Sequence, residues 1–241
     1  MKIRNTLAAL CALTVLTAHA QQELYPNHFN LEEVTLLDGP MKTAMDLNIS
    51  TLLQYDADRL LTPYVRQSGL AATTDTGSRY YKWENSHPSF ANWGDSSFNL
   101  DGHVGGHYLS ALALAYAACH DNDTRAKLKQ RMDYMLEVMK DCQAQYDNNT
   151  DGLYGFIGGQ PINDVWTALY KGDISKYRNR GGWVPFYCQH KILAGLRDAY
   201  LYGNSDEAKA MFVKLADWSV NVVSTLSDSN MNTVLDTEHG G

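Results

Sequence analysis

The residues best suited to chemistry in this chain are histidines at the start of apolar segments. The stretch "GGWVPFYCQHKILAGLRDAY" (181–200) has a helical pattern, and Cys188 and His190 stand in its first turns. They are two positions apart, about 200° around a helix, so they cannot form a thiolate–imidazole nucleophile on one face. His190 is either a core histidine bonded to a neighbour or a hydrogen-bond donor to a ligand. Trp183 just before it favours a pocket that could meet a sugar.

A second apolar segment repeats this arrangement. "HVGGHYLSALALAYAACH" (103–120) begins with His103 and His107, which are four residues apart and therefore share one helical face. A His-x-x-x-His pair can bind zinc, but the intervening residues read VGG and the glutamate of the zinc-protease motif is absent. We predict no metal site here. The two histidines either line a pocket or pack structurally.

The other reactive residue types form no recognisable catalytic set. A glycosidase needs two carboxyl groups that flank the scissile bond, or a substitute nucleophile and an acid, and no such pair stands out. P-loop, GxGxxG and GxSxG motifs are absent from the sequence. Cys119, Cys142 and Cys188 have no metal-type spacing. They are either buried hydrophobic residues or include one disulfide.

The elements that must position these histidines are helices. The hydrophobic spacing predicts one helix from Met41 that ends at Pro63, and four more over 103–120, 125–146, 185–202 and 205–226. Enclosed helices alternate with amphipathic ones, which is typical of the inner and outer helices of an α/α toroid. The long aromatic connections, above all 65–101 with Tyr80, Tyr81, Trp83 and Trp93, are expected to be functional loops.

The N-terminus and the composition indicate an exported protein. Residues 1–20 have the pattern of a secretory signal peptide: the basic residues Lys2 and Arg4, the apolar run 7–16 and the small-residue site Ala18-His19-Ala20. We expect cleavage after Ala20 and a secreted or periplasmic location. The formal charge of −7, about −9 after cleavage, argues against nucleic acid or an anionic membrane as partner. Hydrophobic residues make up 44% of the 241, enough for a core, and no other segment is apolar enough to span a membrane.

Several motifs together resemble a known enzyme family. "NLEEVTLLDGPMKTAMDLNISTLLQYDADRLLTPY", "LDGHVGGHYLSALALAYA", "WVPFYCQHKILAGLRDAY", "ADWSVNVVSTLSDSNM" and the terminal "EHGG" are similar, in order and spacing, to the N-terminal half of bacterial β-L-arabinofuranosidases of glycoside hydrolase families 127 and 146. The resemblance implies an (α/α)6 barrel followed by β-sandwich domains. It also implies release of terminal β-L-arabinofuranosyl units from plant glycans with retention, by a zinc-bound cysteine nucleophile and a glutamate acid/base.

The resemblance also implies which site residues this sequence contains and which it lacks. The family's acid/base glutamate, Glu-x-Cys ligands and Cys-Cys pair lie beyond the EHGG region, so we expect no catalytic residue and no metal ligand in this sequence, and zinc only in the full-length family site. His190 matches a family position that contacts the sugar, and His239 is expected near the same pocket. His103, His107 and Trp183 are predicted sugar-binding residues from their place at helix mouths.

The predicted organisation is a signal peptide (1–20), an extended segment (21–40) and the N-terminal half of the catalytic domain (41–241). The fold class is all-α, a partial (α/α)6 toroid truncated before ring closure, because a closed ring needs more helices than the pattern provides. Such a chain is expected to be inactive alone. A non-catalytic carbohydrate-binding toroid and a helical-repeat interaction protein are the alternatives, and the oligomeric state stays open.

Overall fold

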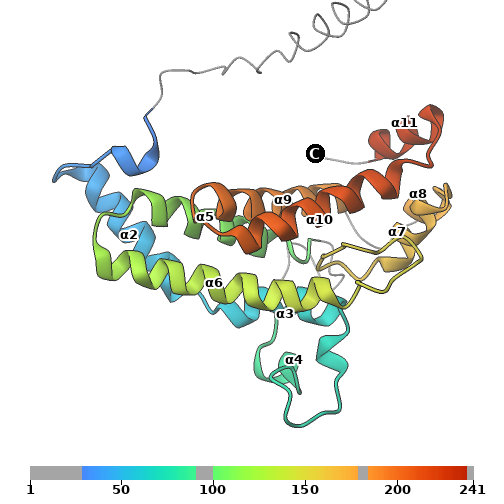
Figure 1. Cartoon of the computed structure of the whole chain (residues 1–241), viewed down its shortest axis with the longest axis horizontal. Helices are drawn as coiled ribbons and strands as arrows, with labels where there is room; N and C mark the ends of the chain where they lie inside the picture. The colour runs from blue at the N-terminus through green and yellow to red at the C-terminus, as the bar shows by residue number, and fades with distance from the viewer. Residues whose placement is uncertain (1–28, 91–99, 179–183, 238–241) are drawn as a thin grey trace, which may run out of the picture. The chain divides into compact units, whose positions relative to one another are not determined.

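The computed structural model describes residues 29–90, 100–178 and 184–237, and all regular elements in these ranges are helices (Figure 1). The predicted all-α class is therefore confirmed, in agreement with a fragment of an α/α toroid. The α-helices are α2 (Pro40–Gln54), α3 (Ala57–Gln67), α4 (Trp83–Ser86), α5 (His103–Ala118), α6 (Asn122–Ala144), α7 (Asn163–Tyr170), α8 (Ser175–Arg178), α9 (Pro185–Leu201), α10 (Asp206–Val223) and α11 (Asp228–Thr237). Two 3-10 turns are η1 (Leu31–Glu33) and η2 (Leu70–Ala72).

Residues up to Val34 form a unit separate from the main body, which begins at Thr35. In the described part of the first unit, the Asn30 amide donates to the Glu33 carboxylate at 2.8 Å and closes η1. The segment 21–40, predicted to be extended, thus contains a helical turn. None of the described helices is long and apolar enough to cross a bilayer.

The prediction that Pro63 ends the first helix is wrong. The helical run instead breaks at Tyr55, and Asp56 starts α3 as its N-cap by accepting from the amides of Asp58 (3.0 Å) and Arg59 (3.3 Å). The helix α3 then continues through Pro63, which lies inside it. Most of the second half of α3 is buried, and this burial offsets the one hydrogen bond that proline cannot donate.

The helices α5 and α9 lie side by side, with α6 and α10 beside them (Figure 1). Their backbones meet at two glycines. A Cβ atom on Gly195 would lie 2.6 Å from the carbonyl oxygen of Gly106, and one on Gly106 would lie 2.7 Å from the amide nitrogen of Ile192. One turn further, the Ser110 hydroxyl donates to the Asp198 carboxylate at 2.8 Å. Small residues therefore set the spacing of the two helices.

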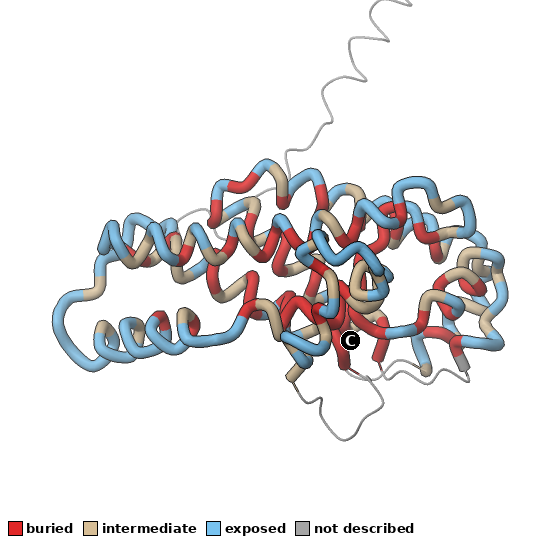
Figure 2. Tube along the Cα trace, turned by 90° about the horizontal axis from the view of Figure 1, so that it is seen from below, coloured by how far each residue is buried: buried red, intermediate tan, exposed pale blue. Residues whose placement is uncertain are grey.

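The predicted enclosure of α5 on all sides is only partly right. The side chains that face α9, α6 and α3 are buried, whereas Val104, His107 and Leu114 are exposed. On α9, His190, Arg197 and Leu201 are also exposed. Buried segments in Figure 2 lie where helices face one another, and exposed segments lie on the outer turns. Each of the two helices thus keeps a stripe that no described element covers.

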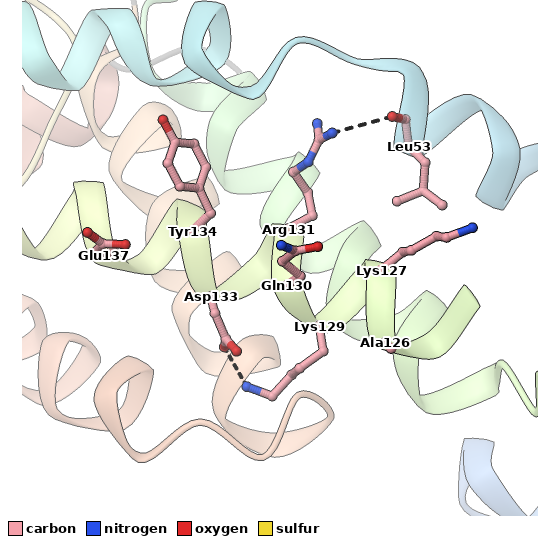
Figure 3. Close-up of a pocket in the computed structure, with 9 residues that line it drawn as sticks. All are labelled: Leu53, Ala126, Lys127, Lys129, Gln130, Arg131, Asp133, Tyr134 and Glu137. Carbon is pink, nitrogen blue, oxygen red and sulfur yellow. Dashed lines mark hydrogen bonds and ion pairs between the residues drawn. The ribbon is translucent and has the colours of Figure 1, made fainter. Parts of the chain in front are cut away.

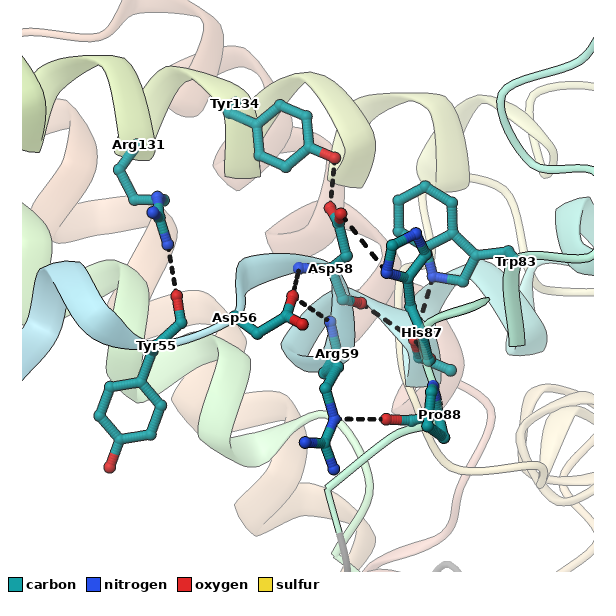
Figure 4. A network of polar contacts seen from close by, with 10 residues as sticks. Tyr55, Asp56, Asp58, Arg59, Trp83, His87, Pro88, Arg131 and Tyr134 are labelled. Carbon is teal, nitrogen blue, oxygen red and sulfur yellow. Dashed lines mark hydrogen bonds and ion pairs between the residues drawn. The ribbon is translucent and has the colours of Figure 1, made fainter. Parts of the chain in front are cut away.

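Two aromatic residues of the connection 65–101, Tyr80 and Trp83, belong to the core of the described structure. Tyr80 and Trp83 are buried, and the Trp83 indole donates to the Thr62 hydroxyl of α3 at 3.0 Å (Figure 4). Thr62 in turn donates to the backbone carbonyl of His87 at 2.6 Å. Trp93 lies outside the described residues. The expectation of a functional loop is therefore not supported by Tyr80 and Trp83.

The three cysteines of the described residues are buried and form no disulfide. Of the two interpretations, buried hydrophobic residues and a disulfide, the first is the one the structure has. Burial raises the pKa of the Cys142 thiol to about 12, so this group stays protonated and unreactive at neutral pH.

Candidate functional site

The helices α5 and α9 bring together the starts of the two histidine-bearing segments. His103 and His107 of α5 have ring centroids 6.1 Å apart, and the ring of Tyr187 in α9 lies 6.0 Å from that of His103. The Lys191 ammonium lies 4.5 Å from the centroid of the Tyr187 ring. His190 is close enough for its charge to act on His107. We call these five residues the α5–α9 mouth.

The histidines of the mouth differ in how they are held. His103 is half-buried, and its Nδ1 donates to the backbone carbonyl of Leu100. Because a carbonyl can only accept, the neutral ring presents its Nε2 as an acceptor. His107 and His190 are exposed, and neither ring forms a hydrogen bond to a described residue. His190 is thus no core histidine satisfied by a neighbour, and its role as a sugar ligand stays a prediction.

The electrostatics of the mouth keep His107 neutral at pH 7. Burial lowers the pKa of His107, and the nearby charges of Lys191, His103 and His190 lower this pKa further. A neutral imidazole offers one donor and one acceptor, and a sugar hydroxyl can bond to both kinds of group. The mouth can therefore bind and orient a polyol.

Two side chains of α3 bind the turn that precedes α5. The Tyr64 hydroxyl donates to the Gly102 carbonyl, and the Arg66 guanidinium forms an ion pair with the buried carboxylate of Asp101. Gly102 has φ of 95° and lies against the backbone of Gly159, where a Cβ atom would come within 3.0 Å of the Gly159 nitrogen. Glycine is needed at this approach because of both the dihedral angle and the contact.

The start of α9 is held by a small apolar cluster. Val184 has φ of 40°, an unfavourable conformation for a β-branched residue that costs about 1–3 kcal/mol. It is buried against Leu100 and Cys188, which ties the entry of α9 to the turn before α5. The predicted site residues Trp183 and His239 lie outside the described residues.

Asp101 should leave a pH signature in the stability of the protein. Burial raises its pKa from 3.8 to about 6, although Arg66 opposes this rise. Since the native carboxyl holds its proton more tightly than the unfolded one, its contribution is fully present below about pH 4 and is lost as the pH rises through 6. We expect the unfolding free energy to lose about 2–3 kcal/mol more between pH 4 and pH 7 in the wild type than in Asp101→Asn. Urea denaturation at both pH values measures this, and equal losses would contradict it.

Sequence reasoning missed Tyr187 and Lys191 of the mouth. Nothing local distinguishes them from other residues of an apolar helix, and they join the site only because α5 approaches α9 closely. The interval of four residues between them, which places both on one face, was the available signal.

Another group of described residues has ligand atoms close enough together to hold a metal ion. Ligand atoms of Asp56, Asp58 and His87 lie within 4.8 Å of one another. These groups already have partners: Asp56 caps α3, and Asp58 accepts from the Tyr134 hydroxyl and faces the His87 ring at 3.6 Å (Figure 4). We interpret these contacts as structural: they hold the segment that carries α4 against α3.

A cavity of about 970 Å³ lies between α6 and the end of α2, and none of the five mouth residues lines it (Figure 3). Its polar groups are largely engaged. Arg131 donates to the carbonyl oxygens of Tyr55 (2.5 Å) and Leu53 (3.5 Å), and Lys129 forms an ion pair with Asp133. The cavity brings no reactive set together.

Comparison with known proteins shows the family to which the chain belongs. A protein-family model described as "Beta-L-arabinofuranosidase, GH127 catalytic domain" matches residues 33–241. The chain belongs to this family. The predicted resemblance is thereby confirmed, and this GH127 chain is part of a glycoside hydrolase family. No curated protein matches its sequence.

The described residues of the GH127 chain do not fit a zinc–thiolate centre. Cys119, Cys142 and Cys188 are buried thiols outside any disulfide, and the group of described residues that could hold a metal ion contains no cysteine. A thiolate centre needs clustered, deprotonated sulfurs. The three cysteines of the described ranges therefore do not form such a centre.

Proposed function

We propose that this protein binds a terminal β-L-arabinofuranosyl unit of a plant glycan at the α5–α9 mouth, as the sugar-binding part of a retaining β-L-arabinofuranosidase. The family match over residues 33–241 carries this proposal. The exposed rings of His107 and His190, which form no hydrogen bond to a described residue, support it, because they leave donors and acceptors for sugar hydroxyls. The ring of Tyr187 adds an apolar surface for the sugar's C–H groups.

The reaction needs groups other than the cysteines of this sequence. Burial keeps the Cys142 thiol protonated, and Cys119 and Cys188 are buried as well. We therefore propose that none of the three cysteines is the nucleophile. We also propose that residues 1–20 direct export, since the substrate is an extracellular polymer.

The proposed function predicts stereospecific binding that depends on the mouth. Calorimetric titration should show binding of methyl β-L-arabinofuranoside and at least fivefold weaker binding of the α-anomer. His190→Ala should weaken binding at least fivefold, because it removes a donor and an acceptor. His120→Ala, which removes an exposed histidine outside the mouth, is the matched control and should change nothing. Equal binding of both anomers, or an effect of His120→Ala as large as that of His190→Ala, would overturn the assignment.

A non-catalytic carbohydrate-binding toroid is the second candidate, because it needs only the sugar-binding groups of the mouth and none of the buried cysteines. Release of nitrophenol from an aryl β-L-arabinofuranoside distinguishes the two. Binding with release supports the hydrolase, in which case Cys142→Ala should leave the rate per folded molecule unchanged. Binding without release supports the binding protein.

A further inference from the structure

The α5–α9 mouth is a positively charged spot on an acidic protein. The whole chain has a formal charge of −7. At pH 7 the positive charge of the mouth is that of the Lys191 ammonium, which lies close enough to act on His107. A positive charge in a binding site of an acidic protein indicates a ligand of the opposite charge.

Lys191 is distinguished from most other described lysines by its lack of an acidic partner. Six lysines of the described ranges form ion pairs with carboxylates: Lys42, Lys129, Lys140, Lys171, Lys176 and Lys214. Lys191 forms none with a carboxylate in the described ranges, although it is half-buried. A half-buried ammonium gains more from an anion than a fully solvated one does.

The acidic residue of α9 and the one that just precedes α5 have other partners. Asp101 pairs with Arg66, and Asp198 accepts from Ser110 (2.8 Å) and Arg197 (2.9 Å). The Lys191 ammonium instead lies over the Tyr187 ring, which holds it beside His103 at the start of the helices. Its position is therefore fixed next to the groups proposed to hold the sugar.

We infer that the α5–α9 mouth takes an acidic glycan, in which the carboxylate of a uronic acid next to the arabinofuranosyl unit pairs with Lys191 while His107 and His190 bond the arabinose hydroxyls. This inference rests on the proposed function and narrows its substrate class. It requires no chemical step, because the uronate only binds.

The test compares two disaccharides that differ in one carboxylate. The probes are β-L-arabinofuranosyl-galacturonic acid and β-L-arabinofuranosyl-galactose, titrated into the full chain at pH 7 and low salt. We expect the acidic probe to bind at least fivefold more tightly, and this advantage to shrink below twofold in 0.5 M NaCl.

Variants assign the effect to Lys191. Lys191→Met keeps the apolar stem over Tyr187 and should abolish the preference for the acidic probe, whereas Lys191→Arg should retain it. Lys209→Met is the matched control, because Lys209 also lies over a tyrosine ring, that of Tyr200 at 4.8 Å on the neighbouring helix. It should leave the preference unchanged.

The outcomes separate this inference from the proposed function. Equal affinity for the two probes, or a preference that survives in Lys191→Met, would overturn the inference and leave the arabinofuranoside site standing. Binding of neither probe would overturn both. If Lys191→Met fails to fold, the salt dependence of the wild type decides: an unchanged ratio of the two affinities in 0.5 M NaCl contradicts the inference.

Discussion

Gly106→Ala is expected to destabilise the protein by about 3 kcal/mol or more. Glycine-to-alanine changes inside a helix ordinarily gain about 1 kcal/mol. Here the new methyl group would overlap the carbonyl of Lys191 and lie 2.7 Å from the amide nitrogen of Ile192. Both obstacles are backbone atoms of α9, so no flexible side chain can move aside. The helices α5 and α9 must separate, which also displaces His107 from His190 and should abolish sugar binding.

Urea denaturation of Gly106→Ala beside Gly77→Ala measures this effect. Gly77 is exposed, and a Cβ there would meet only the Asp75 carboxylate at 3.4 Å. The control should therefore stay within about 0.5 kcal/mol of the wild type. A Gly106→Ala protein as stable as the Gly77→Ala protein would show that the two helices are not in backbone contact.

Trp218→Ala should cost about 3–5 kcal/mol of unfolding free energy. Trp218 of α10 is almost fully buried, and its ring lies 4.8 Å from that of Phe156 and 5.2 Å from that of Trp166. Its indole nitrogen donates to the Gly152 carbonyl at 2.9 Å. Truncation leaves a cavity between α7, α10 and the glycine-rich connection, and it leaves that carbonyl without its donor.

Two further substitutions on α10 control for the loss of Trp218. Trp218→Phe keeps much of the ring volume and loses the hydrogen bond, so its cost should be clearly smaller than that of alanine. Val220→Ala removes a side chain that is 66% exposed and should cost less than about 0.5 kcal/mol. Thermal and urea unfolding should rank the three in this order. A Trp218→Ala protein that unfolds like Val220→Ala would contradict the packing.

The four long helices could be predicted closely from the sequence. The predicted range 185–202 corresponds to α9 at Pro185–Leu201, and 205–226 corresponds to α10 at Asp206–Val223. Local signals were sufficient there. Pro185 occupies the first turn of α9, and Ser205 caps α10 by accepting from the Ala208 amide at 3.2 Å.

The errors arose where distant contacts override local signals. Pro63 is a helix breaker by its chemistry, yet the buried surface of α3 keeps it inside a helix. Tyr80 and Trp83 look like ligand-binding aromatics in a long connection, yet they pack back on α3 through Thr62. Local pattern cannot show which surface a loop will cover.

The candidate site was predictable only in part. The histidines at the starts of two apolar segments indicated a mouth, because similar segments start in a similar way. The close contact of α5 and α9 at Gly106 and Gly195 determines which residues of those turns can reach a ligand. It leaves His107 and His190 exposed and places Lys191 beside them. That geometry is a tertiary property.

The most direct test of the central claim, that the α5–α9 mouth holds an arabinofuranoside, is to follow the histidine side chains by ¹H–¹³C NMR during titration with methyl β-L-arabinofuranoside. We predict that the Hε1 signals of His107 and His190 move together and saturate with one dissociation constant, while those of His87 and His120 stay in place. Silent mouth histidines, or equal movement of His87 and His120, would contradict the account.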